Sequence, residues 1–252
     1  MTDSDAYLER KKRFAQMLTI YGRNTVYEAL SMVGVKARRL HLASSNKKAK
    51  VLDDIEAMAV AQGAEVLYHD KQALSRISKN SKQDQGVALD IHTEALAEFD
   101  AGALESGEYI ALDRVTNPQN LGMIIRSVCA SPIKALILPR KGCAKLDALV
   151  IKASAGSLFR CPILRCDHLV KSLTSAQQCG AIISGLDLNA NANFDTLSSG
   201  KTRIFVLGNE SEGISKELQA LCDERLRITM ARGVESLNVA VTASLIAFRT
   251  QL

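Results

Sequence analysis

The sequence is poor in aromatic residues, with six phenylalanines, five tyrosines and no tryptophan among its 252 residues. Proteins that bind unpaired nucleic-acid bases commonly stack aromatic side chains on them. Because this chain has so few aromatic residues, we expect base stacking to contribute little to any binding. The sequence also lacks any run of 18 or more apolar residues, and its charged start, MTDSDAYLERKKRF, lacks the apolar block of a secretory signal. We therefore expect a cytoplasmic protein without a membrane span.

Residue patterns that bind metals or form disulfide frameworks are missing as well. The six cysteines are scattered without a Cys-x-x-Cys pair, and the four histidines do not cluster with them. These spacings argue against a zinc site and a disulfide framework, and we expect no bound metal. The Gly-x-Gly-x-x-Gly fingerprint is absent too, which disfavours a Rossmann-type enzyme.

The chain has enough apolar residues to bury a core, and its positive charge is unevenly spread. Hydrophobic residues make up 47% of the sequence, enough for one large or two modest domains. The formal net charge is +5, and residues 1–93 hold 15 lysines and arginines against 11 acidic residues, whereas the rest holds 17 against 16. A basic N-terminal part suits binding of a polyanion, although a merely soluble basic surface would give the same numbers.

The N-terminal third has the pattern of a small alternating α/β domain. Asn24 is a suitable N-cap for a helix over residues 24–33, and Asn46 is a suitable N-cap for the next helix. Asp70 opens a third helix. Short strands are expected at residues 40–43, 65–68 and 87–91.

A larger α/β domain is expected after an irregular segment. Residues 93–107 carry small and acidic residues without a strong period, which is typical of a linker. Beyond it, apolar strand candidates alternate with helical segments, at residues 109–112, 135–138, 181–184, 204–207 and 225–228. This alternation predicts a mostly parallel sheet with ligands outside the carboxyl ends of its strands. The predicted parts are a basic extension, an α/β domain, the linker and the larger α/β domain, over residues 1–19, 20–92, 93–107 and 108–252.

Two of the loops in the larger domain carry polar residues at helix starts. In DRVTNPQNLGMIIRS, Asn120 is a good N-cap and Arg126 follows six residues later, so both could approach one phosphate or hydroxyl. In ITMARGVESLNVAVTASLIAF, Ser236 and Asn238 stand where a C-terminal helix begins, close to its free N–H groups. Taken singly, each loop also fits an ordinary capped helix.

A third loop, GNESEGIS at residues 208–215, directly follows an apolar strand. It resembles a phosphate loop, but Ile214 occupies the place of the phosphate-binding lysine, so hydrolysis of nucleoside triphosphates is a poor interpretation. Glycines beside Asn209 and Glu210 would let the backbone approach a ligand closely while presenting an amide and a carboxylate. An ordinary turn into a helix fits the same residues.

Taken together, the three loops resemble the sequence motifs of the SpoU/TrmH family of SPOUT RNA 2′-O-ribose methyltransferases. They match the patterns N-x-G-x-x-x-R at residues 120–126, G-N-E-x-x-G-x-S at 208–215 and S-L-N-V at 236–239, in the family's order. The segment KASAG at 152–156 is also family-like. The resemblance spans about residues 108–252, and the first domain, beginning YGRNTVYEAL, resembles the substrate-binding domain of the ribosomal-RNA members.

The resemblance implies a SPOUT domain with a C-terminal trefoil knot, a homodimer, and S-adenosylmethionine as the cofactor that methylates a ribose 2′-hydroxyl, with a guanosine of large-subunit ribosomal RNA as the expected target. It assigns catalysis to Arg126, Asn120, Glu210, Ser236 and Asn238. It assigns cofactor binding to Gly208, Asn209, Gly213, Ile228, Met230 and Leu237. The residues expected to bind RNA are Arg23, Asn24, Arg38, Arg39, Lys47 and Lys48.

Arg126 is expected to clamp a phosphate and to stabilise the developing alkoxide, since arginine side chains keep their proton at any working pH. Two alternatives stay open. The first is a transfer-RNA ribose methyltransferase on the same fold. The second is a non-catalytic RNA-binding protein, because Ser211, Thr229 and Ala240 stand where the family commonly has glycine, proline and serine.

Overall fold

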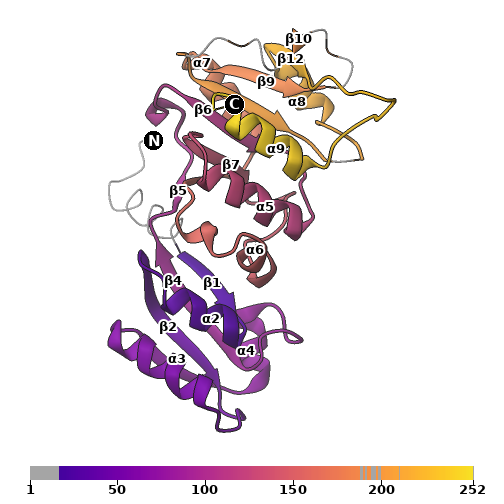
Figure 1. Cartoon of the computed structure of the whole chain (residues 1–252). Helices are drawn as coiled ribbons and strands as arrows, with labels where there is room; N and C mark the ends of the chain where they lie inside the picture. The colour runs from indigo at the N-terminus through magenta and orange to yellow at the C-terminus, as the bar shows by residue number, and fades with distance from the viewer. Residues whose placement is uncertain are drawn as a thin grey trace. The chain divides into compact units, whose positions relative to one another are not determined.

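The computed structural model describes residues 17–187, 190, 192–193, 197, 200–209 and 211–251, which fold into two compact units (Figure 1). The first unit holds the described residues up to Leu96 together with Leu146–Arg160, and the second holds Ala97–Lys145 and the chain from Cys161 onward. The chain thus leaves the first unit inside the segment predicted as a linker. Within the described residues, no helix is long and apolar enough to cross a membrane.

The first unit is built on a four-stranded sheet in the order β1-β4-β2-β3. Strand β4 pairs antiparallel with β1 and β2, and β3 pairs parallel with β2. The alternation predicted from the sequence is confirmed, with β1 as an additional strand. The elements are β1 (Met17–Tyr21), α2 (Arg23–Leu30), β2 (Val35–Ala43), α3 (Lys50–Ala61), β3 (Glu65–His69), α4 (Lys71–Ser78) and β4 (Val87–Thr93), with α6 (Ala148–Ala153) and the 3₁₀ turn η2 (Ser157–Phe159) from later in the chain.

Of the three helix caps predicted in this unit, one is confirmed and two are wrong. Asp70 caps α4 by accepting a hydrogen bond from the Ala73 amide at 2.8 Å. Asn24 instead lies inside α2, whose N-cap is Gly22 with φ +89°, a conformation that glycine adopts without strain. Asn46 lies in the loop before α3 and donates its side-chain amide to the Gly86 carbonyl at 2.9 Å. Its side chain therefore joins two loops rather than opening a helix.

The second sheet has eight strands in the order β10-β12-β9-β11-β6-β7-β8-β5. The seven strands from β10 to β8 pair in parallel, which confirms the predicted mostly parallel sheet. The trefoil knot stays a prediction. The strands are β5 (Leu96–Glu98), β6 (Glu108–Leu112), β7 (Ala135–Pro139), β8 (Ile163–Cys166), β9 (Ile182–Leu186), β10 (Ala192–Asn193), β11 (Arg203–Leu207) and β12 (Glu224–Arg227).

Apolar central strands and two neighbouring helices position the loops of this unit. All five residues of β11 are buried, as expected for a strand covered on both faces. Helices α5 (Pro118–Cys129) and α9 (Val239–Phe248) lie side by side, and the hydroxyl oxygens of Ser127 and Ser244 are 2.8 Å apart (Figure 1). The remaining helices are η1 (Ala101–Ala103), α7 (Leu169–Gln178) and α8 (Lys216–Leu221).

A chain of polar side chains crosses the first sheet, with His41 buried at its centre. His41 is only 4% exposed, and its ring nitrogens lie 3.2 Å from Asp90 Oδ2 and 3.0 Å from His69 Nε2. Thr19 donates a hydrogen bond to Asp90 Oδ1 at 2.6 Å. Burial raises the pKa of Asp90, but hydrogen bonds from His41 and Thr19 outweigh it and hold this pKa below its ordinary value.

We predict that Asp90→Asn destabilises this unit more at neutral pH than in acid. Because the folded state lowers the pKa of Asp90, its carboxylate stabilises the fold above the unfolded pKa of about 3.9, and this contribution is lost as the pH falls through the lower folded pKa. Urea unfolding of the wild type and the variant, followed by circular dichroism between pH 3 and pH 7, measures the difference. If the urea concentration at the midpoint of unfolding differed between wild type and variant by the same amount at pH 3 and at pH 7, the prediction would be wrong.

Candidate active site

A pocket of about 430 Å³ lies within the second unit, beside the carboxyl ends of β9, β11 and β12. Ligands of open α/β sheets bind outside the carboxyl ends of strands, in pockets of roughly 300–1,000 Å³. The wall comes from three stretches, residues 186–187, 207–219 and 226–242. It includes the catalytic candidate Ser236 and all six residues expected to hold the cofactor, namely Gly208, Asn209, Gly213, Ile228, Met230 and Leu237.

The loop after β11 folds back on itself to form one side of this pocket. Asn209 and Gly213 exchange two backbone hydrogen bonds of 3.1 and 2.8 Å. A Cβ atom at Gly208 would lie 2.1 Å from the Gly213 carbonyl carbon and 2.3 Å from the Ile214 amide nitrogen. Side-chain carbons do not approach backbone so closely, so this loop requires glycine at position 208.

The Asn209 side chain serves the shape of the loop. Its oxygen accepts hydrogen bonds from the Ser211 and Glu212 amides at 2.8 and 3.3 Å, and its nitrogen donates to the Arg114 carbonyl at 3.2 Å. From the sequence we expected the side-chain amide of Asn209 to face a ligand. In the structure these three hydrogen bonds within the protein occupy that amide instead. Glu210, the other polar residue expected there, lies outside the described residues.

Arg114, which sequence analysis missed, fastens this loop to the end of β6. Its guanidinium lies 3.4 Å from Asp113, donates to the Gly213 carbonyl at 3.1 Å and pairs with Glu212. Asp113 in turn accepts a hydrogen bond from the Ser215 amide at 2.7 Å. Arg114 lies just after the carboxyl end of a parallel strand, and that position was a signal that could have identified it.

Asn120 and Asn238 meet where α5 and α9 begin. Asn238 is the N-cap of α9 and accepts a hydrogen bond from the Ala240 amide at 2.8 Å, while its side-chain nitrogen donates to Asn120 Oδ1 at 3.1 Å. The prediction that Asn120 caps α5 is wrong. Asn117 is the cap, because Pro118 occupies the first helical position and leaves the preceding asparagine extended.

Arg126 is not part of the pocket wall. Its side chain is exposed on α5 and makes no ion pair or hydrogen bond with the described residues, whereas Asn120 on the same helix is buried. Six residues of helix place the two side chains about 120° apart around its axis. Within one chain, the structure therefore brings Asn120 to Asn238 but does not bring Arg126 to either.

Two family models match this chain. Residues 108–248 match the SpoU rRNA Methylase family, and residues 19–96 match the model for RNA 2′-O ribose methyltransferase substrate binding. The chain belongs to the SpoU rRNA methylase family. It is an S-adenosylmethionine-dependent RNA 2′-O-ribose methyltransferase, and the predicted resemblance is confirmed.

Similar proteins cover much of this SpoU enzyme. An uncharacterized tRNA/rRNA methyltransferase of Mycolicibacterium paratuberculosis is 32% identical over 241 residues, which is 93% of this chain and 77% of that protein. The crystal structure of an AdoMet-bound rRNA methyltransferase from Sinorhizobium meliloti shares the fold, with a TM-score of 0.66, 23% identity and coverage of 98% and 90%. That of a TrmH/SpoU tRNA modifying enzyme from A. aeolicus has a TM-score of 0.52, 26% identity and coverage of 58% and 75%.

Three carboxylates line the pocket of the SpoU enzyme. Asp187, Glu212 and Glu235 belong to the wall, and sequence analysis singled out none of them. Glu212 is paired with Arg114, Asp187 lies 3.5 Å from Arg225, and Arg227 also belongs to the wall, so arginines offset much of this negative charge. Burial raises the pKa of Cys143 and that of Cys222 to about 11, so neither thiol is ionised near neutral pH or supplies a thiolate nucleophile.

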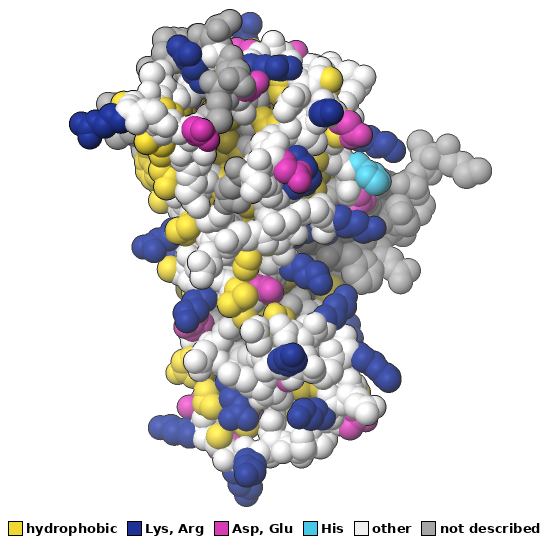
Figure 2. All heavy atoms as spheres, turned by 90° about the vertical axis from the view of Figure 1, so that its right-hand side faces the viewer, with side chains coloured by type: hydrophobic (Ala, Val, Ile, Leu, Met, Phe, Trp, Pro, Cys, Tyr) yellow, Lys and Arg dark blue, Asp and Glu magenta, His cyan; other side chains and the backbone are white. Residues whose placement is uncertain are grey.

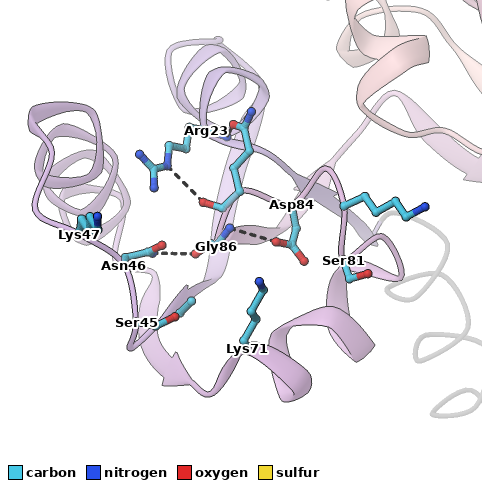
Figure 3. A pocket seen from close by; sticks show the side chains of 11 residues that line it. Arg23, Ser45, Asn46, Lys47, Lys71, Ser81, Asp84 and Gly86 are labelled. Atoms are coloured by element: carbon cyan, nitrogen blue, oxygen red, sulfur yellow. Dashed lines mark hydrogen bonds between the residues drawn. The ribbon is translucent and has the colours of Figure 1, made fainter.

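The residues expected to bind RNA are spread over the first unit of the SpoU enzyme. Arg23 and Lys47 line one pocket, whereas Arg38 and Arg39, nearer the start of strand β2, are not among the residues that line it. Arg39 approaches Asp90 at 3.9 Å. Asn24 lies in α2 and Lys48 in the loop before α3. Figure 2 shows that lysine and arginine side chains outnumber acidic ones on the visible face of this unit, and Figure 3 shows the pocket that Arg23 and Lys47 line.

Proposed function

We propose that this enzyme methylates a ribose 2′-hydroxyl of large-subunit ribosomal RNA, with a guanosine as the expected target, and that the 430 Å³ pocket holds S-adenosylmethionine. The observation that carries the proposal is the convergence of the motifs. The six expected cofactor residues, from the loops after β11 and β12, share one pocket, and the Asn120–Asn238 hydrogen bond joins the first motif, more than 80 residues earlier in the sequence, to the third.

The walls of the pocket fit this cofactor. The close approach at Gly208 leaves backbone rather than side chain facing the ligand, and apolar side chains such as Ile214, Leu226 and Val239 suit a flat adenine. Glu235 in the wall carries a negative charge that suits the positive sulfonium. When bound, S-adenosylmethionine supplies the methyl group that is transferred.

The side chains around the pocket are proposed to position the acceptor. Asn120 and Asn238 would hold the ribose hydroxyl, Ser236 would hold the loop at the pocket, and Glu210 would orient the ribose. Arg126 would clamp the neighbouring phosphate and stabilise the alkoxide that forms as the hydroxyl proton leaves to phosphate or water. Positioning two reacting groups in this way lowers a barrier by about 7–11 kcal/mol.

A second copy of the chain is the proposed partner of helices α5 and α9. Met123 on α5 is 43% exposed and Val241 on α9 is 48% exposed, although both helices otherwise bury apolar residues. Exposed apolar side chains on neighbouring helices suit a homodimer contact. Arg126, one turn from Met123, would then lie at the border between two chains.

Ribosomal RNA is favoured over transfer RNA by the extent of the matches. A structure from Sinorhizobium meliloti that covers 98% of this chain is named an rRNA methyltransferase, whereas the tRNA modifying enzyme from A. aeolicus covers 58%. The first unit, which matches a substrate-binding model, gives the enzyme an additional RNA contact. A transfer-RNA substrate remains the second candidate because the Mycolicibacterium relative is named a tRNA/rRNA methyltransferase. Both substrates would place the enzyme in the cytoplasm.

The purified enzyme should be incubated with labelled S-adenosylmethionine and unmodified ribosomal RNA, transfer RNA and large-subunit precursor particles. We expect label in large-subunit RNA, as a 2′-O-methyl nucleoside after digestion, and a dimer mass in light scattering. Label in transfer RNA alone would establish the second candidate. RNA binding without label in any acceptor would instead indicate a non-catalytic RNA-binding protein.

A further inference from the structure

Arg114 lies directly after strand β6 in a left-handed backbone conformation, with φ +58°. Residues with a side chain rarely adopt this conformation, and those that do gather at binding sites, where the surrounding structure holds them. We propose that Arg114 is a positioning residue for the cofactor, and that it acts by holding Glu212 and Gly213 in the shape that binds S-adenosylmethionine. The inference rests on the proposed function, because it takes the 430 Å³ pocket as the cofactor site.

The guanidinium of Arg114 is fully engaged inside the second unit. Its Nε donates to Asp113 at 3.4 Å, its Nη2 donates to the Gly213 carbonyl at 3.1 Å, and its Nη1 pairs with the Glu212 carboxylate. Each of the three nitrogen atoms therefore has a partner in the protein. In this respect Arg114 differs from Arg126, and it is not placed to clamp a phosphate of the RNA.

The backbone of Arg114 contacts the same loop. Its carbonyl accepts a hydrogen bond from the Asn209 side chain at 3.2 Å, and Asn209 closes the turn by exchanging two backbone hydrogen bonds with Gly213. Arg114 thus meets both ends of this turn, Asn209 through its carbonyl and Gly213 through its guanidinium. Because Asn209, Glu212 and Gly213 all line the pocket, a single residue outside the wall fixes the shape of one side of it.

These contacts add little to the stability of the fold. The side chains of Arg114 and Glu212 are 36% and 68% exposed, and ion pairs this open to water contribute little to folding. The left-handed backbone of a residue with a side chain costs stability, whereas glycine would follow the same path without that cost. What the arginine contributes beyond a glycine is its hold on two residues of the pocket wall, which points to the ligand rather than to the fold.

Arg114 affects cofactor binding in two ways that have opposite signs. Its charge offsets Glu212, so charge alone predicts that removing Arg114 frees a carboxylate and tightens binding of the positive sulfonium. Its contacts keep the loop in shape, so their loss would add an entropy cost of ordering the loop when the cofactor binds. Water and salt screen exposed charges, and we therefore expect the cost of ordering the loop to exceed the gain in charge attraction.

The test replaces Arg114 by glycine in the full-length enzyme, which removes the side chain and leaves the positive φ unstrained. Lys79→Gly is the matched control, because Lys79 is also a cation with a left-handed backbone, φ +55°, and lies at the end of α4 in the first unit. Calorimetry measures the Kd for S-adenosylmethionine. Methyl transfer to ribosomal RNA over a range of cofactor concentrations gives KM and kcat, and circular dichroism gives the melting temperature without cofactor.

We expect Arg114→Gly to raise both the Kd and the KM for S-adenosylmethionine about tenfold, as when the binding shape is populated about a tenth of the time. Its kcat at saturating cofactor should stay within about twofold of wild type, and its melting temperature should not fall. Lys79→Gly should bind the cofactor like wild type. Unchanged or tighter binding by Arg114→Gly, a lower kcat with an unchanged Kd, a lower melting temperature beside the weaker binding, or an equal loss in the control would each overturn the proposal.

Two further variants test whether Arg114 acts through Glu212. Arg114→Lys keeps the charge opposite Glu212 without the planar fork, so its Kd should lie between those of wild type and Arg114→Gly. Glu212→Gln should weaken cofactor binding in the wild-type enzyme but change little in Arg114→Gly, where the pair is already broken. Equal losses in both backgrounds would show that Glu212 acts on the cofactor directly, and would overturn the proposal.

Failure of the proposed function would look different from failure of this inference. The calorimetric measurement needs no RNA, so it applies whichever RNA is methylated. Wild type that binds no S-adenosylmethionine, or a Gly208→Ala variant that binds it normally, would refute the assignment of the pocket and this inference with it. Wild type that binds the cofactor no more tightly than Arg114→Gly would refute the role of Arg114 alone.

Discussion

Replacing Arg126 by alanine is expected to abolish measurable methyl transfer to RNA while leaving the affinity for S-adenosylmethionine unchanged. The side chain is exposed on α5 and does not line the cofactor pocket, so its loss leaves the walls of that pocket intact. Removing a donor that stabilises an oxyanion lowers the rate by roughly 10²–10³, and loss of the phosphate clamp adds to this. Single-turnover assays with labelled cofactor measure the rate, and calorimetry measures cofactor affinity.

Arg126→Lys is the matched variant, because it keeps the charge and removes the planar fork. Its rate should lie between those of wild type and Arg126→Ala. If the alanine variant transferred methyl groups within a few-fold of wild type, Arg126 would have no catalytic role, whatever the RNA substrate. If the alanine variant also bound S-adenosylmethionine more weakly, the conclusion that Arg126 lies outside the cofactor pocket would be wrong.

Gly208→Ala should eliminate detectable binding of S-adenosylmethionine. The added Cβ would lie 2.1 to 2.3 Å from three backbone atoms of Gly213 and Ile214, and backbone cannot move aside as a flexible side chain can. The loop would have to open and the hydrogen bonds between Asn209 and Gly213 would break. Calorimetric titration with the cofactor measures this loss, and circular dichroism checks that the fold survives.

Gly213→Asn provides the control in the same loop. Gly213 has φ +66°, a conformation that asparagine tolerates, and a Cβ there meets nothing within 4 Å. This variant should weaken cofactor binding far less than Gly208→Ala. Equal losses in the two variants would show that the loop tolerates no side chain at all, and the steric explanation for Gly208 would be wrong.

The sequence predicted the second sheet well because its strands are short, apolar and bounded by loops. β6, β7, β9, β11 and β12 all lie within a residue or two of their predicted positions. In this sheet β5, β8 and β10 were missed, with β5 lying inside the predicted linker, and β1 of the first sheet was missed as well. Each is short, and the ILRC stretch of β8 carries Arg165 in place of an unbroken apolar run. Pairing with neighbouring strands, which no local pattern encodes, decides such cases.

The predicted cap of α5 was wrong because two capping residues competed. In NPQN, both Asn117 and Asn120 favour helix starts, and the proline between them decides for Asn117, a signal that was present in the sequence. Asn120 then became available to Asn238, which no spacing rule connects to it. Arg114 was missed for a related reason, because its partners Glu212 and Gly213 come from another loop.

The hydrogen bond between Asn120 and Asn238 joins positions 118 residues apart, and this has a consequence for how the enzyme matures. All four strands of the first sheet lie between residues 17 and 93, so that sheet needs only local stretches of chain. Closing a loop of more than a hundred residues costs entropy before any contact repays it. We therefore expect the first sheet of a newly made chain to form early, and methyl transfer to become possible only once α9 has docked.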